Sequence, residues 1–139
     1  MNVARIFLII ICTYLVGCHE NISRIQFSKT VLYIGKINAG DSIRTSFEYK
    51  NIGDKPLKIT HIDVECECTN ITNANKSINP GEFGVINILY KSSKLSDIGE
   101  QQKSLSIQTN GVPQNILLYF KVKIINDSLK NLLSKSPTN

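Results

Sequence analysis

Residues 43–50 read IRTSFEYK, and this stretch decides the fold class. Its side chains form two alternating sets: Ile43, Thr45, Phe47 and Tyr49 in one, and Arg44, Ser46, Glu48 and Lys50 in the other. Successive side chains of a β-strand point to opposite faces, so this period of two predicts a strand. One face of that strand packs on a core, and the other meets solvent.

Similar segments lie on both sides of this strand, and turn signals separate them. The sequence NAGD at 38–41 precedes it and NIGDKP at 51–56 follows it, with glycine and proline as turn-forming residues. Further strands are expected over 25–33, with a break inside it as an alternative, over 57–64 with a bulge near His61, over 83–90, around 105–107 and over 116–124. The polar residues 66–79 are expected to hold at most one short strand.

About seven short strands at this spacing, without a convincing helix among them, predict an all-β sandwich. Phe27, Phe47, Phe83 and Phe120 are assigned to its core. The NG pair at 110–111 predicts a hairpin between the last two strands.

The composition suits one globular domain. The chain has 139 residues, of which 42% are hydrophobic and 19% are charged, and this balance argues against disorder. Its net charge of +5 comes from scattered lysines, without the arginine cluster and interleaved aromatic residues of a nucleic-acid surface. We therefore expect no nucleic-acid partner, and no motif in the chain calls for a cofactor.

The N-terminus has the pattern of a secretory signal followed by a lipidation site. Residues 6–16 are almost entirely apolar, but they are too few for the roughly 20 positions that a membrane-spanning helix needs. Leu15-Val16-Gly17-Cys18 then resembles a lipobox, in which Cys18 receives a diacylglycerol and a peptidase cuts before it. The small Gly17 side chain suits that cut. An uncleaved anchor helix, or a secretion signal with an incidental cysteine, is the alternative.

The chain accordingly divides into a signal peptide over 1–17, a lipid-anchored tether over 18–24, the sandwich over 25–125 and a short helical or disordered tail over 126–139. His19, rather than an aspartate, follows the cysteine, and by the enteric sorting rule this favours anchoring in the outer membrane over the inner one. Cys66 and Cys68 are then the two free cysteines of the exported part, in a compartment that favours oxidation.

An ordered set of motifs resembles the DUF1573 family. The set comprises NIGDKPLKI at 51–59, CECT at 66–69, PGE at 80–82, INILY at 86–90 and TN at 109–110. That family is abundant in Bacteroidetes-type bacteria and is similar to the immunoglobulin-like domains of the ASPM/SPD-2/Hydin group. The resemblance covers residues 31–124 and implies an immunoglobulin-like sandwich, without an assigned biochemical function. Glu67 departs from the small residue, often glycine, that the family usually has between its two cysteines.

The Cys66 and Cys68 pair is the main candidate site. In a strand, residues two apart share a face at about 6.6 Å, which is the outer limit for a disulfide, although a local kink would allow one. Two thiolates on one face could instead hold a soft metal such as Cu(I) or Zn, together with His61. A structural role, packed or oxidised, is the favoured interpretation. Asp63, Glu65 and Glu67 alternate along the same segment and indicate a solvated face.

No residue pattern supports catalysis, since His61 has no recognisable orienting partner as a base for either cysteine. The sequence therefore predicts a non-catalytic protein of the cell envelope that acts as a protein-interaction or structural module. It would meet the membrane through its lipid and an unidentified envelope protein through a sheet edge or the loops 66–79 and 91–102. The alternative is a periplasmic thiol-redox or soft-metal-binding protein that uses Cys66 and Cys68.

Overall fold

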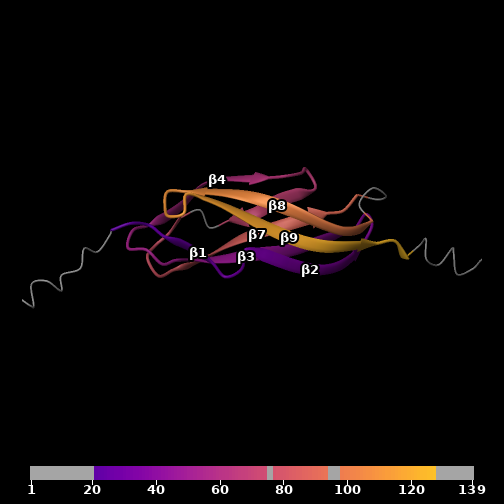
Figure 1. The fold of residues 1–139 in the computed structure, drawn as a ribbon, viewed down its shortest axis with the longest axis horizontal. Helices are drawn as coiled ribbons and strands as arrows, with labels where there is room; N and C mark the ends of the chain where they lie inside the picture. The colour runs from indigo at the N-terminus through magenta and orange to yellow at the C-terminus, as the bar shows by residue number, and fades with distance from the viewer. Residues whose placement is uncertain (1–20, 75–76, 94–97, 128–139) are drawn as a thin grey trace, which may run out of the picture.

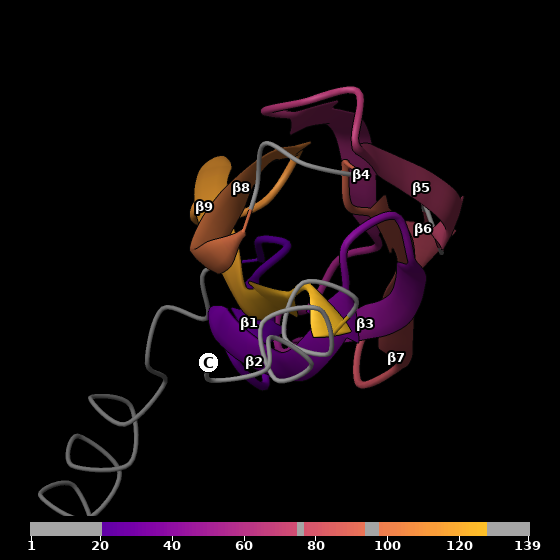
Figure 2. The same ribbon diagram turned by 90° about the vertical axis from the view of Figure 1, so that its right-hand side faces the viewer.

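The computed structural model describes residues 21–74, 77–93 and 98–127, and within them the chain forms two β-sheets packed face to face (Figures 1 and 2). One sheet has the strand order β1 (Ile25–Phe27), β3 (Ser42–Asn51), β7 (Phe83–Lys91) and β5 (Thr69–Ala74). The other has the order β2 (Val31–Asn38), β9 (Asn115–Ile125), β8 (Gly99–Thr109), β4 (Leu57–Val64) and β6 (Ser77–Ile78). The predicted all-β sandwich is confirmed.

Several local predictions are also confirmed. The expected strand over 25–33 is broken, because β1 joins one sheet and β2 crosses to the other, where it pairs in parallel with β9. The bulge expected near His61 lies between Ile59 and His61. One prediction is wrong: residues 66–79 hold two strands, β5 and β6, rather than at most one. The many asparagines in this segment gave it a low strand propensity. Its strands form because they pair with the neighbouring strands β4 and β7.

The core lies between the sheets and is built by the alternation that the sequence displays. Phe47, Tyr49, Tyr90 and Phe120 are all almost completely buried. Burial raises the pKa of the Tyr49 hydroxyl to about 12. The ring of Tyr49 fills the space beside Gly84 that any side chain at that position would need.

The assignment of Phe83 to the core is wrong, since 69% of this residue is exposed. In β7 the inward positions are the even ones, from Gly84 through Tyr90, so strand parity turns position 83 outward. Phe27, also assigned to the core, is partly buried and packs on the Tyr49 ring with the centroids 5.5 Å apart.

Residues 22–24 are hydrogen-bonded into one end of the sandwich, although the sequence placed them in a tether. The Ile22 carbonyl accepts from the Asp54 amide at 2.8 Å, and the Arg24 carbonyl accepts from the Ile52 amide at 2.8 Å. On the other side, the Ser23 carbonyl accepts from the Val112 amide at 3.0 Å. The segment therefore runs between two turns and is part of the domain.

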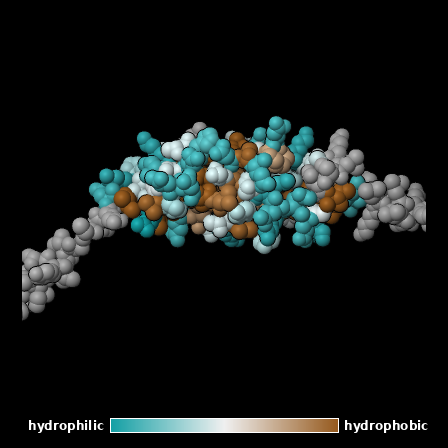
Figure 3. All heavy atoms as spheres, turned by 45° about the horizontal axis from the view of Figure 1, so that its top comes forward, coloured by the Kyte–Doolittle hydropathy of each residue, from teal (hydrophilic) through white to brown (hydrophobic). Residues whose placement is uncertain are grey.

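We call this part of the molecule the entry end and define it as residues 22–24, the turns 52–56, 79–82 and 110–114, and the strand residues that adjoin them. Glycine makes the threading possible, because a Cβ on Gly53 would collide with the backbone of residues 22–24, and one on Gly111 would lie 2.8 Å from the Ser23 carbonyl oxygen. Figure 3 shows hydrophobic side chains at this end, next to the point where the described chain begins.

Candidate functional site

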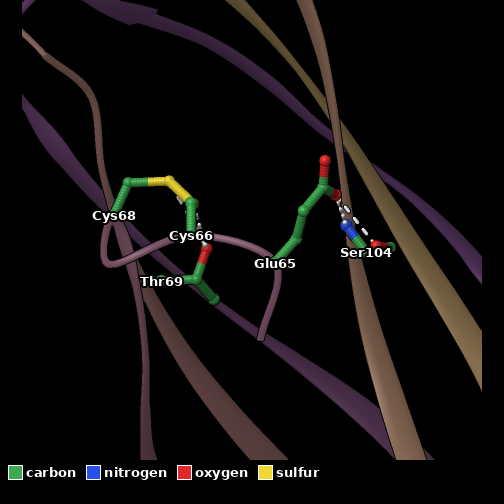
Figure 4. Close-up of a disulfide and its surroundings, with 5 residues drawn as sticks. All are labelled: Glu65, Cys66, Cys68, Thr69 and Ser104. Carbon is green, nitrogen blue, oxygen red and sulfur yellow. Dashed lines mark hydrogen bonds between the residues drawn. A yellow bond between two sulfur atoms is a disulfide. The ribbon is translucent and has the colours of Figure 1, made fainter. Parts of the chain in front are cut away.

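The cysteine pair lies at a corner, residues 65–68, where the chain leaves β4 and crosses to β5 in the other sheet (Figure 4). Cys66 and Cys68 form a disulfide, with their Cα atoms 5.1 Å apart. This separation is shorter than the strand value of about 6.6 Å because the residues form a turn, which the Thr69 amide closes by donating to the Cys66 carbonyl at 3.1 Å. The kink that a disulfide requires is therefore present.

Polar side chains surround the corner. The Thr69 hydroxyl lies 3.5 Å from the Cys66 Sγ and 3.9 Å from the Cys68 Sγ. The Glu65 carboxylate accepts from the Ser104 hydroxyl at 2.8 Å and from the Ser104 amide at 2.9 Å, which ties the corner to β8 (Figure 4). These bonds to the charged form hold the pKa of Glu65 below its ordinary value of 4.5.

His61, the third candidate metal ligand, is not brought to the sulfur atoms. It lies on the exposed face of β4, where its Nε2 is 2.8 Å from the Asp63 Oδ1. In the described part of the chain, no three histidine, cysteine, aspartate or glutamate side chains gather as a metal-binding group. The sulfur atoms pair with each other, and the structure does not bring His61 to them.

Beside the corner, β4 presents a free strand edge. Its neighbour β6 pairs only with Leu57 and Lys58, so in the described residues no strand covers the outer edge of β4 from Ile59 to Val64. The Glu65 amide donates to the Ser104 carbonyl of β8. The alternation of an antiparallel ladder then directs the backbone groups of Ile62 and Val64 toward the free edge.

This edge borders a groove of about 450 Å³ between β4 and β5, the strands at which the two sheets separate. Residues 59–62 line one wall and residues 71–74 line the other. Each wall contains a bulge, one between Ile59 and His61 and one between Ile71 and Asn73. At the second bulge, the Thr72 hydroxyl donates to the Asn87 carbonyl at 3.3 Å. Sequence reasoning missed this groove because it did not identify β5; the spacing of Thr69 and Ile71 was the available signal.

The opposite side of the sandwich is closed. There the chain crosses from β1 to β2, and this crossing is bonded to both sheets: the Ser28 amide donates to the Glu48 carbonyl at 2.9 Å, and the Thr30 carbonyl accepts from the Tyr119 amide at 2.8 Å. The hollow beside it is only about 230 Å³. The groove between β4 and β5 is thus the more open of the two sides.

A further hollow of about 470 Å³ lies on the outer face of the five-stranded sheet. A bulge in β2 between Tyr33 and Lys36, with Gly35 at φ +89°, places both side chains beside Lys121 and Lys123 of β9. Glu100 also lines this hollow, so its three lysines outnumber its one carboxylate. Cys18, the expected lipidation site, and residues 128–139 of the expected tail lie outside the described residues.

No helix in the described residues is long and apolar enough to cross a membrane. No curated protein matches the sequence.

Solved structures share the fold at low identity. A protein of unknown function from Porphyromonas gingivalis W83 is 15% identical with a TM-score of 0.62, over 78% of this chain and 50% of its own, so this chain spans half of that protein. The ASH/PapD-like domain 7 of human CEP192 is 7% identical with a TM-score of 0.60, over 80% and 92%. The CupB2 chaperone of Pseudomonas aeruginosa is 18% identical with a TM-score of 0.51, over 78% and 59%.

At these identities the likenesses show the fold alone, an immunoglobulin-like β-sandwich like that of the ASH/PapD-like domain. At the level of sequence, the profile of the DUF1573 family matches residues 25–124, which cover most of the chain and run from the first residue of β1 to the last but one of β9. The chain therefore belongs to the DUF1573 family of proteins of unknown function.

Proposed function

We propose that the protein is a non-catalytic module of the cell envelope, lipid-anchored at Cys18 in the outer membrane, that binds an extended segment of another envelope protein in the groove between β4 and β5. The free edge of β4 beside this groove is the observation that carries the proposal. An edge strand offers unpaired backbone donors and acceptors, and strand addition is a general way to use them.

The groove also limits what can bind. The outer edge of β4 is both regular and uncovered only from His61 to Val64. The bulge limits this stretch on one side, and the disulfide corner limits it on the other. A partner can therefore add only a short strand there. Ile62 and Ile71, both partly buried, stand on opposite walls of the groove. A segment with apolar side chains at alternate positions would bury them against these two residues.

Site-specific photo-crosslinking tests this proposal in intact cells. A photoreactive amino acid at Thr60 on one wall and at Thr72 on the other should each yield an adduct with the same envelope protein. Lys29 and Glu48, beside the small hollow on the opposite side, are the matched control positions. Adducts that form equally from the control positions, or different proteins captured from the two walls, would refute docking in the groove.

The lipid anchor has a test of its own. Cys18→Ala should abolish incorporation of labelled fatty acid and leave the precursor uncut, because the thiol is the acceptor of the diacylglycerol. Cys12→Ala, within the signal peptide, is the matched control and should retain the label. Label that persists in Cys18→Ala would mean that the lipid is attached elsewhere or that the chain is not a lipoprotein.

The second candidate function is thiol redox chemistry or soft-metal binding at Cys66 and Cys68. One observation favours it: both cysteines are partly exposed at a corner outside the strands, where an attacking thiolate or a metal can approach. The structure brings no third ligand to them in its described residues. For this reason we rank this candidate below the interaction module.

A further inference from the structure

We infer that the entry end is a membrane-docking surface: its apolar tips enter the interfacial layer of an anionic bilayer, and the surrounding cations meet the lipid headgroups. This inference goes beyond groove binding and rests on the proposed anchor at Cys18 only for the orientation of the domain.

Three large hydrophobic residues are exposed at the entry end, and each comes from a different segment. Ile52 is 46% exposed in the turn after β3, Val112 is 46% exposed in the turn before β9, and Phe83 is 69% exposed at the first position of β7. Single exposed hydrophobic residues are common, but several gathered at one end indicate an interaction surface. In the part of the chain that the structure describes, the other large exposed hydrophobic residues are on the outer face of the five-stranded sheet (Val31, Tyr33 and Leu117) and at the opposite end (Ile98).

Cationic side chains accompany these tips. They are Arg24, Lys50, Lys55 and Lys58, against the carboxylates Asp54 and Glu82 at the same end. The Lys50 ammonium lies 5.0 Å from the centre of the Phe83 ring. An aromatic ring with a cation above it suits the interface of a bilayer, where the ring enters the acyl boundary and the ammonium stays among the phosphates. Cations in excess over carboxylates favour an anionic surface.

The start of the described chain brings this end close to the proposed anchor. Cys18 is three positions before Asn21, and three residues span at most about 10 Å when fully extended. Residues 22–24 are fixed to the turns by backbone hydrogen bonds, so the entry end cannot move far from acyl chains attached at Cys18. The groove, by contrast, opens on the side of the sandwich, where a partner can reach it.

The tips are also held rigidly. Asn51, which is completely buried, donates from its side-chain amide to the Lys55 carbonyl at 2.8 Å and accepts from the Gly53 amide at 3.0 Å. The turn that carries Ile52 is thus fixed before any contact with lipid. Insertion then costs little conformational entropy, because the apolar groups are presented in advance.

Fluorescence can test the docking directly, because the chain contains no tryptophan. The full chain with Phe83→Trp carries a reporter at the entry end, and the full chain with Tyr33→Trp carries a matched control on the outer face, where Tyr33 is 77% exposed. Each is incorporated into vesicles of phosphatidylethanolamine and phosphatidylglycerol that contain brominated lipid. We expect a blue shift and strong quenching from Phe83→Trp and neither from Tyr33→Trp.

A second pair of substitutions shows what holds the surface on the bilayer. Ile52→Ser with Val112→Ser, in the Phe83→Trp chain, should weaken the partition of the reporter into lipid about tenfold, because two apolar tips are lost. Pure phosphatidylcholine vesicles should weaken it as well, because the anionic headgroups are absent. Circular dichroism checks that the altered chains remain folded.

The outcomes separate docking from anchoring. A chain that carries fatty-acid label and stays with the vesicles, but whose Phe83→Trp reporter is not quenched, overturns the docking and leaves the anchor intact. A chain without label whose reporter is still quenched by added vesicles supports the docking and refutes the anchor. A reporter that shifts with protein concentration in detergent alone, and not with lipid, would overturn the docking in favour of a second copy of the chain.

Discussion

Each end of the sandwich contains a buried polar side chain that bonds to several turn residues, Asn51 at one end and Ser92 at the other, but the two ends are built in different ways. At the entry end, Asn51 bonds to Lys55, Gly53 and Ile78. At the opposite end, which we call the far end, the Ser92 hydroxyl contacts the carbonyl oxygens of Asn38 and Asp41 at 3.1 and 3.2 Å and accepts from the Gly40 amide at 2.9 Å.

The difference lies in what surrounds these two residues. The entry end is held by backbone hydrogen bonds to residues 22–24, and at Gly53 and Gly111 the neighbouring backbone leaves no room for a side chain. The far end includes the corner 65–68, where two side-chain links, the disulfide and the Glu65 carboxylate, add to the backbone hydrogen bonds. We therefore expect substitutions at the entry end to be severe, because backbone cannot move aside, and those at the far end to be milder.

The largest expected effect is at Gly53. In Gly53→Ala the new methyl group would meet the backbone of residues 22–24, so the free energy of unfolding should fall by about 3 kcal/mol. Gly81→Ala is the matched control at the same end: its φ is +81° but the surrounding space is open, so the loss should be about 1 kcal/mol. Urea unfolding measures both. Equal losses in the free energy of unfolding would mean that the close packing of residues 22–24 against Gly53 does not contribute to stability.

Asn51 and Ser92 allow the two ends to be compared directly, because each substitution to alanine removes a buried, hydrogen-bonded polar side chain. Asn51→Ala removes one donor group and one acceptor from a site without water access, so we expect a loss of about 2–3 kcal/mol. Ser92→Ala should lose about 1–2 kcal/mol, because a single hydroxyl serves its turn. Thermal and urea unfolding of both variants give the ranking. A greater loss of stability from Ser92→Ala would contradict the expectation that the entry end is the more sensitive of the two.

The disulfide is expected to matter less than Asn51 and about as much as Ser92. Cys66→Ser with Cys68→Ser should leave a folded domain and lower the free energy of unfolding by about 1–2 kcal/mol, because so short a loop removes little entropy from the unfolded chain.

The same double variant separates the two candidate functions. Mass spectrometry of the reduced protein with Cu(I) or Zn should show no stoichiometric adduct if the corner is structural. An adduct that forms in the natural chain and disappears in the double variant would establish the soft-metal function. Rapid exchange of the bridge with glutathione would likewise support the thiol-redox function.

The smallest effect concerns pH. The pKa of Glu65 is lower in the folded protein than its ordinary value of 4.5, so its bonds to Ser104 stabilise the fold above that pH, and the stabilisation is lost as the pH falls through the folded pKa. Glu65→Gln should thus be slightly less stable than the natural chain at pH 7, and the difference should vanish in acid. Glu67→Gln, which removes a carboxylate of the same corner without touching the bonds to Ser104, is the matched control.

The sequence by itself determined most of the strands and the alternation of side chains along them. The alternation over residues 43–50 appears unchanged in β3, and the slip of phase in β4 appears as its bulge, because strand parity is a local property of the chain. The same local reasoning failed at Phe83, where an apolar residue was taken to be buried although the parity of β7 turns it outward.

Only the tertiary structure decided which residues come together. β5 exists because β7 pairs with it, and the groove exists because β4 and β5 belong to different sheets. The gathering of Ile52, Phe83 and Val112 at one end depends on three turns that are far apart in the chain. Parity and turn chemistry act over a few residues and are readable from the sequence, whereas pairing between sheets and the grouping of distant turns depend on how the whole chain packs.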